Sequence, residues 1–180
     1  KNPFNKWILL NYEQCRVATE DSIKNYRFNE AANELYKFTW NIFCDWYLEF
    51  TKSVFNKNEA SDITETRSVT SFILTNILIM LHPIMPFFTE HLWNIAPSIL
   101  KHNSNPINRA TWPEKIELSK DSCSEIETLK ELITAIRSTR SEMNVPANVF
   151  VELYFSEADN HLTSIIEKYE DTLFVLTKIN

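Results

Sequence analysis

The sequence contains no glycine among its 180 residues. A chain of this length and average composition would hold about a dozen. Dinucleotide-binding loops, P-loops and nucleophile elbows all use glycine for a positive φ angle or for close approach of the backbone. The sequence therefore excludes these three kinds of site and disfavours tight β-hairpins. It favours a helical protein whose turns use Asn, Pro, Asp and Ser.

The charge balance limits how this chain can meet nucleic acid. The formal net charge is −6 at pH 7, and the sequence pI is about 5.3. Such a molecule does not attract polyanions as a whole, so any nucleic-acid site must be a local patch. Hydrophobic residues make up 44% of the chain and aromatic residues 13%, which is enough for a globular core and excludes disorder.

The cysteines and the apolar stretches predict a cytoplasmic chain with no membrane segment. Cys15, Cys44 and Cys123 form no CxxC pair and are odd in number, which favours unpaired thiols in a reducing compartment. No signal peptide opens the sequence. The most apolar stretch, residues 71–88, is interrupted by polar residues and prolines, so it is predicted to be a buried, broken helix.

Apolar residues recur at three- and four-residue spacing through most of the chain, which predicts a mostly α-helical bundle. Ser61 or Asp62 is the predicted N-cap of the third helix, and Pro83 is expected to stop or kink it. The polar segment 100–120 is predicted to be a surface connection anchored to the core by Trp112. The predicted helices span approximately residues 5–21, 27–55, 61–81, 86–95 and 122–143.

The pattern changes after residue 146. Apolar residues alternate along 149–155, which predicts a strand, and residues 159–169 are predicted to be helical. A lone strand has unpaired edges and is not stable by itself. We therefore divide the chain into a helical bundle, residues 1–146, and the truncated start of a small α/β appendage, residues 147–180.

The side chains that could carry metal or nucleophilic chemistry favour structural roles. The four histidines show no paired helical spacing, so no metal site is predicted. Cys44 lies in an aromatic segment and is predicted to be a packed thiol whose pKa is raised by the neighbouring carboxylate of Asp45. Asp45 and Glu49 share a helix face, which predicts a solvated surface or, alternatively, a contact to a neighbouring domain.

Two arginines stand three residues apart on one predicted helix. Arg137 and Arg140 could form a phosphate clamp, because the planar guanidinium makes bidentate bonds to phosphate and stacks on bases. Alternatively, they form structural salt bridges with Glu131, Glu142 or another carboxylate of the bundle, and spacing alone slightly favours this second interpretation.

Aromatic residues of the second helix suggest base stacking as well as packing. Phe38 and Trp46 lie on the predicted core stripe, so packing is the stronger interpretation for them. Trp40 lies off that stripe, and its role stays open.

Three ordered segments resemble valyl-tRNA synthetases, a family of class Ia aminoacyl-tRNA synthetases. Residues 27–32 (RFNEAA) and 40–49 (WNIFCDWYLE) resemble the long helix of the family's anticodon-binding bundle. Residues 81–93 (LHPIMPFFTEHLW) resemble the segment LHPxMPFxTExLW, which several class I synthetases share. Residues 137–146 (RSTRSEMNVP) resemble IRxxRxEMNVPP, which is more specific to the valyl enzymes. The match covers approximately residues 7–155.

The sequence departs from the family in ways that limit the activity expected of this chain by itself. Ala147 replaces the second proline of the last segment. The family's ATP-binding signatures are missing, because one contains glycine and no methionine here is followed by the lysine-rich loop. The family's C-terminal coiled-coil arm is also missing. We therefore expect that this chain cannot activate valine and holds neither a catalytic residue nor a cofactor.

The resemblance implies a role as part of a valine–tRNA ligase that uses ATP with Mg. The implied partners are the anticodon stem-loop of tRNA(Val) and the catalytic and editing domains of the same parent chain, in a monomeric cytoplasmic enzyme. The alternatives are the same domain of an isoleucyl, leucyl or methionyl synthetase, or a helical interaction scaffold with no RNA role. The implied tRNA-binding residues are Arg137, Arg140 and Asn144, with Arg27 and Lys24 as further candidates.

Overall fold

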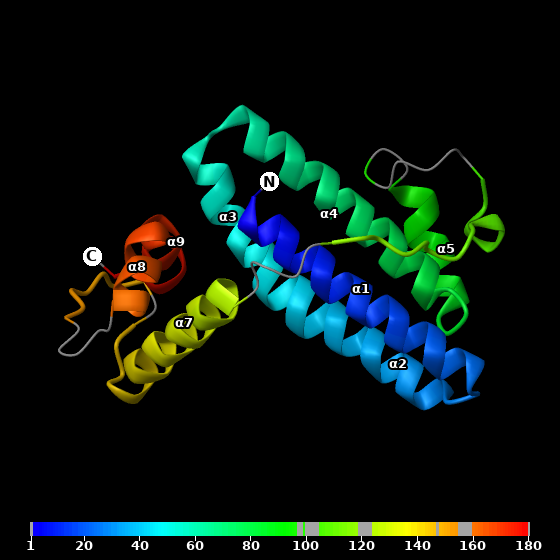
Figure 1. Ribbon diagram of the computed structural model, residues 1–180, viewed down its shortest axis with the longest axis horizontal. Coiled ribbons are helices and arrows are strands. Elements are labelled where there is room, and N and C mark those ends of the chain that lie inside the picture. The colour runs from blue at the N-terminus through cyan, green and yellow to red at the C-terminus, as the bar shows by residue number, and fades with distance from the viewer. Residues whose placement is uncertain are drawn as a thin grey trace.

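Two antiparallel helical rods form the centre of the computed structural model, which describes residues 2–96, 99, 105–118, 124–146, 148–154 and 160–179 (Figure 1). The first rod is α1 (Pro3–Lys24). The second runs through α2 (Phe28–Lys37), the π-helix η1 (Phe38–Tyr47) and α3 (Leu48–Lys57). These bounds confirm the helices predicted over 5–21 and 27–55.

The π-helical segment η1 changes which residues the second rod buries. Its wider turn bonds each amide to the carbonyl five residues back, as Leu48 N–H does with Phe43. The deeply buried side chains therefore recur at spacings of five and four, at Phe38, Phe43 and Tyr47. Trp46 is turned toward the edge of the core and stays half-buried. The prediction that Trp46 lies on the core stripe assumed α-helical spacing, and it placed this residue inside the core.

Helices α4 (Ala60–Leu81) and α5 (Pro86–Ile95) complete this side of the bundle, with α4 lying along α1 (Figure 1). The break at residues 82–85 confirms the predicted stop. The predicted N-cap of α4 is wrong, because Glu59 occupies that position and both Ser61 and Asp62 lie inside the first turn. The physical reason is that Asn58 adopts the left-handed conformation, at φ 56°, and reverses the chain within two residues.

Residues 105–118 form the described part of the predicted surface connection. It contains the short 3₁₀ turn η2 (Ile107–Arg109) and then lies extended. Trp112 is half-buried against the main core, as predicted, and the indole of Trp93 on α5 donates to the carbonyl of Asn105 at 2.9 Å. Cys123 and the predicted helix start at residue 122 fall outside the described residues.

Three further helices form the other end of the molecule (Figure 1): α7 (Ser124–Glu142), α8 (Asn160–Lys168) and α9 (Glu170–Thr177). The predicted strand is wrong over its described part, since residues 149–154 form only one isolated bridge, between Val151 and Ile179. No described neighbour offers a second extended edge, so the alternating side chains pack on helices instead: Val151 and Leu153 lie against the main core.

The C-terminal helices pack on the bundle. Helix α9 contacts α3 and α7, and its Leu173 belongs to the main core. The Thr172 hydroxyl hydrogen-bonds that of Ser53 at 3.1 Å inside this contact. The domain boundary predicted at residue 146 stays a prediction.

Candidate nucleic-acid interface

A groove of about 710 Å³ opens between η1 and α7. One wall comes from the wide turns of η1 and the start of α3, and the other from the exposed side of α7. The groove offers an indole ring, a guanidinium, hydroxyls and two carboxylates, so it can stack and hydrogen-bond a planar ligand. It is lined by Cys44, Asp45, Trp46, Glu49, Thr134, Arg137, Ser138 and Ser141.

Trp46 lines the groove, and two cations lie close to its indole ring. Its ring packs on Phe50, with 5.7 Å between ring centroids. The Lys130 ammonium lies 5.5 Å from its ring centroid and the Arg137 guanidinium 6.0 Å away. These cation–π contacts place two cations beside one aromatic ring, of which Lys130 also pairs with Glu127 at 2.8 Å. Sequence spacing missed this arrangement, because it treated Trp46 as a core residue of an α-helix.

Arg137 is exposed and keeps free hydrogen-bonding capacity. Its Nε and Nη2 atoms donate to the carbonyl of Leu176, at 3.3 and 3.1 Å. Leu176 lies in the last turn of α9, where carbonyls lack intrahelical donors and the helix dipole favours a cation. The three other N–H bonds of the guanidinium have no protein acceptor among the described residues, so they are available to a ligand.

Arg140 is placed differently, since its side chain is buried. Its Nη2 donates to the carbonyls of Pro146 and Val149 at 2.9 and 2.7 Å, and its Nη1 to that of Lys178 at 3.4 Å. The guanidinium thus joins α7 to the chain that follows it and to the end of α9. In the described structure neither Arg137 nor Arg140 forms an ion pair, so the salt bridges offered as an alternative are absent there.

Asn144 ends α7 in the left-handed conformation, with φ at 54°. Its own N–H donates to Ser141, and the N–H of Val145 reaches back to the carbonyl of Arg140 at 2.9 Å. This is the arrangement in which glycine usually ends a helix. Its side chain is exposed beside the groove wall formed by Ser141.

The remaining two predicted residues lie at the opposite end of the molecule, by the turn between α1 and α2 (Figure 1). Lys24 pairs with Glu20. Arg27 pairs with Asp21 at 2.6 Å and Glu30 at 3.1 Å. The structure does not bring them together with Arg137, and their charges are largely balanced by these carboxylates.

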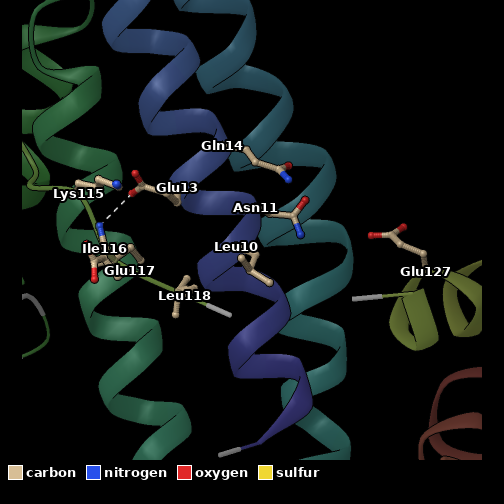
Figure 2. Close-up of a pocket in the computed structure, with 9 residues that line it drawn as sticks. All are labelled: Leu10, Asn11, Glu13, Gln14, Lys115, Ile116, Glu117, Leu118 and Glu127. Atoms are coloured by element: carbon tan, nitrogen blue, oxygen red, sulfur yellow. Dashed lines mark hydrogen bonds between the residues drawn. The ribbon is translucent and has the colours of Figure 1, made fainter. Parts of the chain in front are cut away.

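A second groove, between α1 and the segment 115–118, is more acidic than the first. Figure 2 shows Glu13 on α1 accepting the Ile116 N–H at 3.3 Å, with Glu127 of α7 on the far side. Burial raises the pKa of Glu13, but the Arg16 guanidinium and the Ile116 N–H outweigh it and lower the pKa below the ordinary 4.5. Three carboxylates and one lysine line this groove, so it does not suit a phosphate.

Other chemistries find little support in the described residues. No three His, Cys, Asp or Glu side chains gather there as metal ligands. Burial, and secondarily the charge of Asp45, raises the pKa of Cys44, so its thiol is a poor nucleophile. Within the same residues, no helix combines the length and apolar character that crossing a membrane requires.

Comparison with known proteins gives one family for most of the chain. The family model of the "Anticodon-binding domain of tRNA ligase" matches residues 5–154. The valine–tRNA ligase of Brucella suis biovar 1 (strain 1330) is 35% identical over 175 residues, which is 97% of this chain and 19% of that protein. That of Mesorhizobium japonicum is 42% identical over 142 residues, 79% of this chain and 15% of that protein.

A third relative is also matched over about a fifth of its length. The valine–tRNA ligase of Bartonella henselae is 35% identical over 179 residues, 99% of this chain and 20% of that protein. The chain thus spans about a fifth of the length of the curated relatives that it matches. All eight residues that line the groove between η1 and α7 lie within the matched residues 5–154.

Proposed function

The chain belongs to the family of anticodon-binding domains of tRNA ligases, and from this premise we propose that it binds the anticodon stem-loop of tRNA(Val) as part of a valine–tRNA ligase. By holding that stem-loop it would set the position of the tRNA for ATP-dependent aminoacylation, with Mg, in a catalytic domain elsewhere in the parent chain. The parent enzyme would be a cytoplasmic monomer that also carries an editing domain.

The observation that carries this proposal at the level of residues is the groove between η1 and α7. Arg137 has three free N–H bonds for a phosphate or a base edge. Trp46 lines the groove beside the cation of Arg137 and offers an aromatic side chain for contact with a base. The exposed carboxylate of Asp45 can accept hydrogen bonds from a base amino group. An unpaired loop nucleotide combines the anionic, planar and donor groups that these side chains require.

We propose different roles for the other predicted residues. The exposed amide of Asn144 hydrogen-bonds the RNA at the end of α7. Arg140 acts as a positioning residue, because its bonds to three carbonyls hold the end of α7. Lys24 and Arg27 supply weak, secondary contacts at the far end, since both are already paired with carboxylates.

The relatives do not favour the alternatives. Those compared above are all valine–tRNA ligases, so the isoleucyl, leucyl or methionyl synthetase domain is a weaker interpretation. A scaffold without an RNA role has no support from the family model.

The direct test is binding of this chain to anticodon stem-loops of tRNA(Val) and tRNA(Ile), each at 50 and 200 mM salt. The expected result is a preference for the valine loop that persists at the higher salt, because base contacts are less screened than phosphate attraction. Equal affinity for both loops would contradict valyl specificity. Absence of binding to either would contradict an anticodon-binding role for this chain.

A further inference from the structure

Six consecutive apolar residues, 83–88, with the sequence PIMPFF, are exposed over the turn between α4 and α5 and the first turn of α5. We call this segment the apolar loop. Phe87 is 90% exposed, and Phe88 is 51% exposed. A run of this kind on a water-facing surface is unfavourable for solubility unless another molecule or domain covers it.

The apolar loop is held rigidly by hydrogen bonds at its base. The Ile84 and Met85 amides both donate to the carbonyl of Leu81, at 2.9 and 2.8 Å. The Thr89 hydroxyl donates to the carbonyl of Met85 at 2.9 Å and lies 2.7 Å from His82 Nδ1. Two prolines further restrict the backbone. The backbone that carries the exposed side chains is therefore preorganised, which lowers the entropic cost of docking.

A hollow of about 630 Å³ lies directly beside the apolar loop. The turns α1–α2 and α4–α5 meet at this end of the molecule (Figure 1). Its wall is almost wholly apolar, and large side chains of a partner commonly anchor in such a hollow. The apolar residues that line it are Ile23, Phe28, Ala31, Pro83, Ile84 and Trp112.

The charges around this end favour a protein partner over RNA. Lys24 and its ion-pair partner Glu20 line the hollow, and Arg27 in the adjoining turn pairs with Asp21 and Glu30. Phosphate binding needs cations whose counterions can be released, and those paired here supply little. An apolar centre with a rim of balanced charges is instead the usual composition of a protein interface.

We propose that the apolar loop and the adjacent hollow dock an apolar surface of another folded domain of the same parent ligase, with one large side chain of that domain inserted into the hollow. The inference rests on the proposed function, since the chain spans about a fifth of its relatives and four fifths of such a polypeptide lie outside it. The rigid loop would fix the bundle, and the RNA bound at its opposite end, relative to the rest of the enzyme.

Hydrogen exchange in the complete ligase and in the isolated chain tests this docking. The Phe87 and Phe88 amides are sensitive reporters, because the first turn of a helix provides no intrahelical acceptor for them. We expect at least tenfold slower exchange at both amides in the complete ligase. Equal exchange in the two proteins would overturn the proposal, whether or not any variant folds.

A pair of matched variants adds a functional test. Phe87→Glu should lower the aminoacylation kcat/KM of the complete ligase at least tenfold, whereas Val17→Glu, on an exposed face of α1, should change it less than twofold. In the isolated chain, both variants should keep the wild-type unfolding midpoint and bind the valine stem-loop within twofold of wild type, because both side chains are exposed.

Three other outcomes overturn the docking proposal. A selective loss of stem-loop binding in Phe87→Glu would make the apolar loop an RNA contact. A dimer of the isolated chain in sedimentation that Phe87→Glu dissociates would make it a homodimer surface. Unchanged kcat/KM in Phe87→Glu would mean that docking has no part in the enzyme. Failure of the wild-type chain to bind any stem-loop, with the amides still protected in the complete protein, would refute the proposed function alone.

Discussion

The Nη2 atom of Arg140 lies 2.7 Å from the carbonyl oxygen of Val149 and donates a hydrogen bond to it, although the side chain of Arg140 is buried. The same guanidinium also reaches carbonyls of Pro146 and Lys178. One cation therefore fixes the exit of α7 and the end of α9 together. Arg137, three residues earlier on α7, is exposed to solvent. Arg140 is therefore placed to stabilise the fold, whereas Arg137 is placed to contact a ligand.

Arg140→Ala should lower the free energy of unfolding by about 1 to 3 kcal/mol, because it removes a buried guanidinium that donates to three carbonyls at the ends of α7 and α9. Arg140→Lys should recover less than half of this loss, since an ammonium lacks the planar fork that reaches several acceptors. Urea unfolding followed by tryptophan fluorescence measures both. Wild-type stability in Arg140→Ala, together with lost stem-loop binding, would instead make Arg140 a direct RNA contact.

Arg137→Ala should weaken binding of the valine stem-loop by about 1 to 3 kcal/mol, because the exposed guanidinium loses its contact to phosphate or base. Arg67→Ala on α4 is the matched control, being an exposed arginine with no ion pair in the described structure. Fluorescence anisotropy with labelled stem-loop measures both affinities. Equal losses in the two variants would indicate general charge attraction and contradict a specific role for the groove.

Asn144→Gly should keep or slightly raise stability, whereas Asn144→Ala should lower it by about 1 kcal/mol, because an alanine in the left-handed conformation pays a steric cost. Thermal unfolding distinguishes the two variants. Stem-loop binding then separates the two roles of the residue. If the amide side chain contacts RNA, Asn144→Gly must bind more weakly while remaining stable; unchanged binding would restrict Asn144 to ending the helix.

The unfolding free energy should fall as the pH drops below the ordinary glutamate pKa. Burial raises the pKa of Glu13, but hydrogen bonds from Arg16 and the Ile116 N–H lower it by more than burial raises it (Figure 2). The pKa of Glu13 therefore lies below 4.5. A carboxylate with a lowered pKa stabilises the fold above its unfolded-state pKa, and this contribution disappears as the pH falls through its folded-state pKa.

Glu13→Gln should therefore be less stable than wild type at pH 7 and lose less stability between pH 5 and pH 3. Glu131→Gln, at an exposed position of α7 with no ion pair in the part of the chain described, should follow the wild-type pH dependence. Urea unfolding at several pH values measures the three slopes. Parallel curves of unfolding free energy against pH for wild type and Glu13→Gln would show that the pKa of Glu13 is the same in the folded and the unfolded chain.

The sequence by itself determined the local features of this protein. Apolar spacing predicted most helices, and prolines marked the break between α4 and α5, because these signals act within a few residues. The lack of glycine also had a local consequence, since Asn58 and Asn144, two of the four left-handed positions among the described residues, carry the residue type that best replaces it. The family resemblance was carried by segments of the same local kind.

Only the tertiary structure decided where the side chains of the candidate site lie. The π-helical turns of η1 moved Trp46 to the edge of the core, and no spacing rule for α-helices anticipates that rotation. Arg140 is held inward by the carbonyls of Pro146 and Val149 and by that of Lys178, 38 residues away in sequence. The expected strand was replaced by packing on helices, because a strand needs a partner edge and the described chain provides only the single bridge between Val151 and Ile179. Each of these outcomes depends on contacts between segments far apart in sequence, which local patterns do not encode.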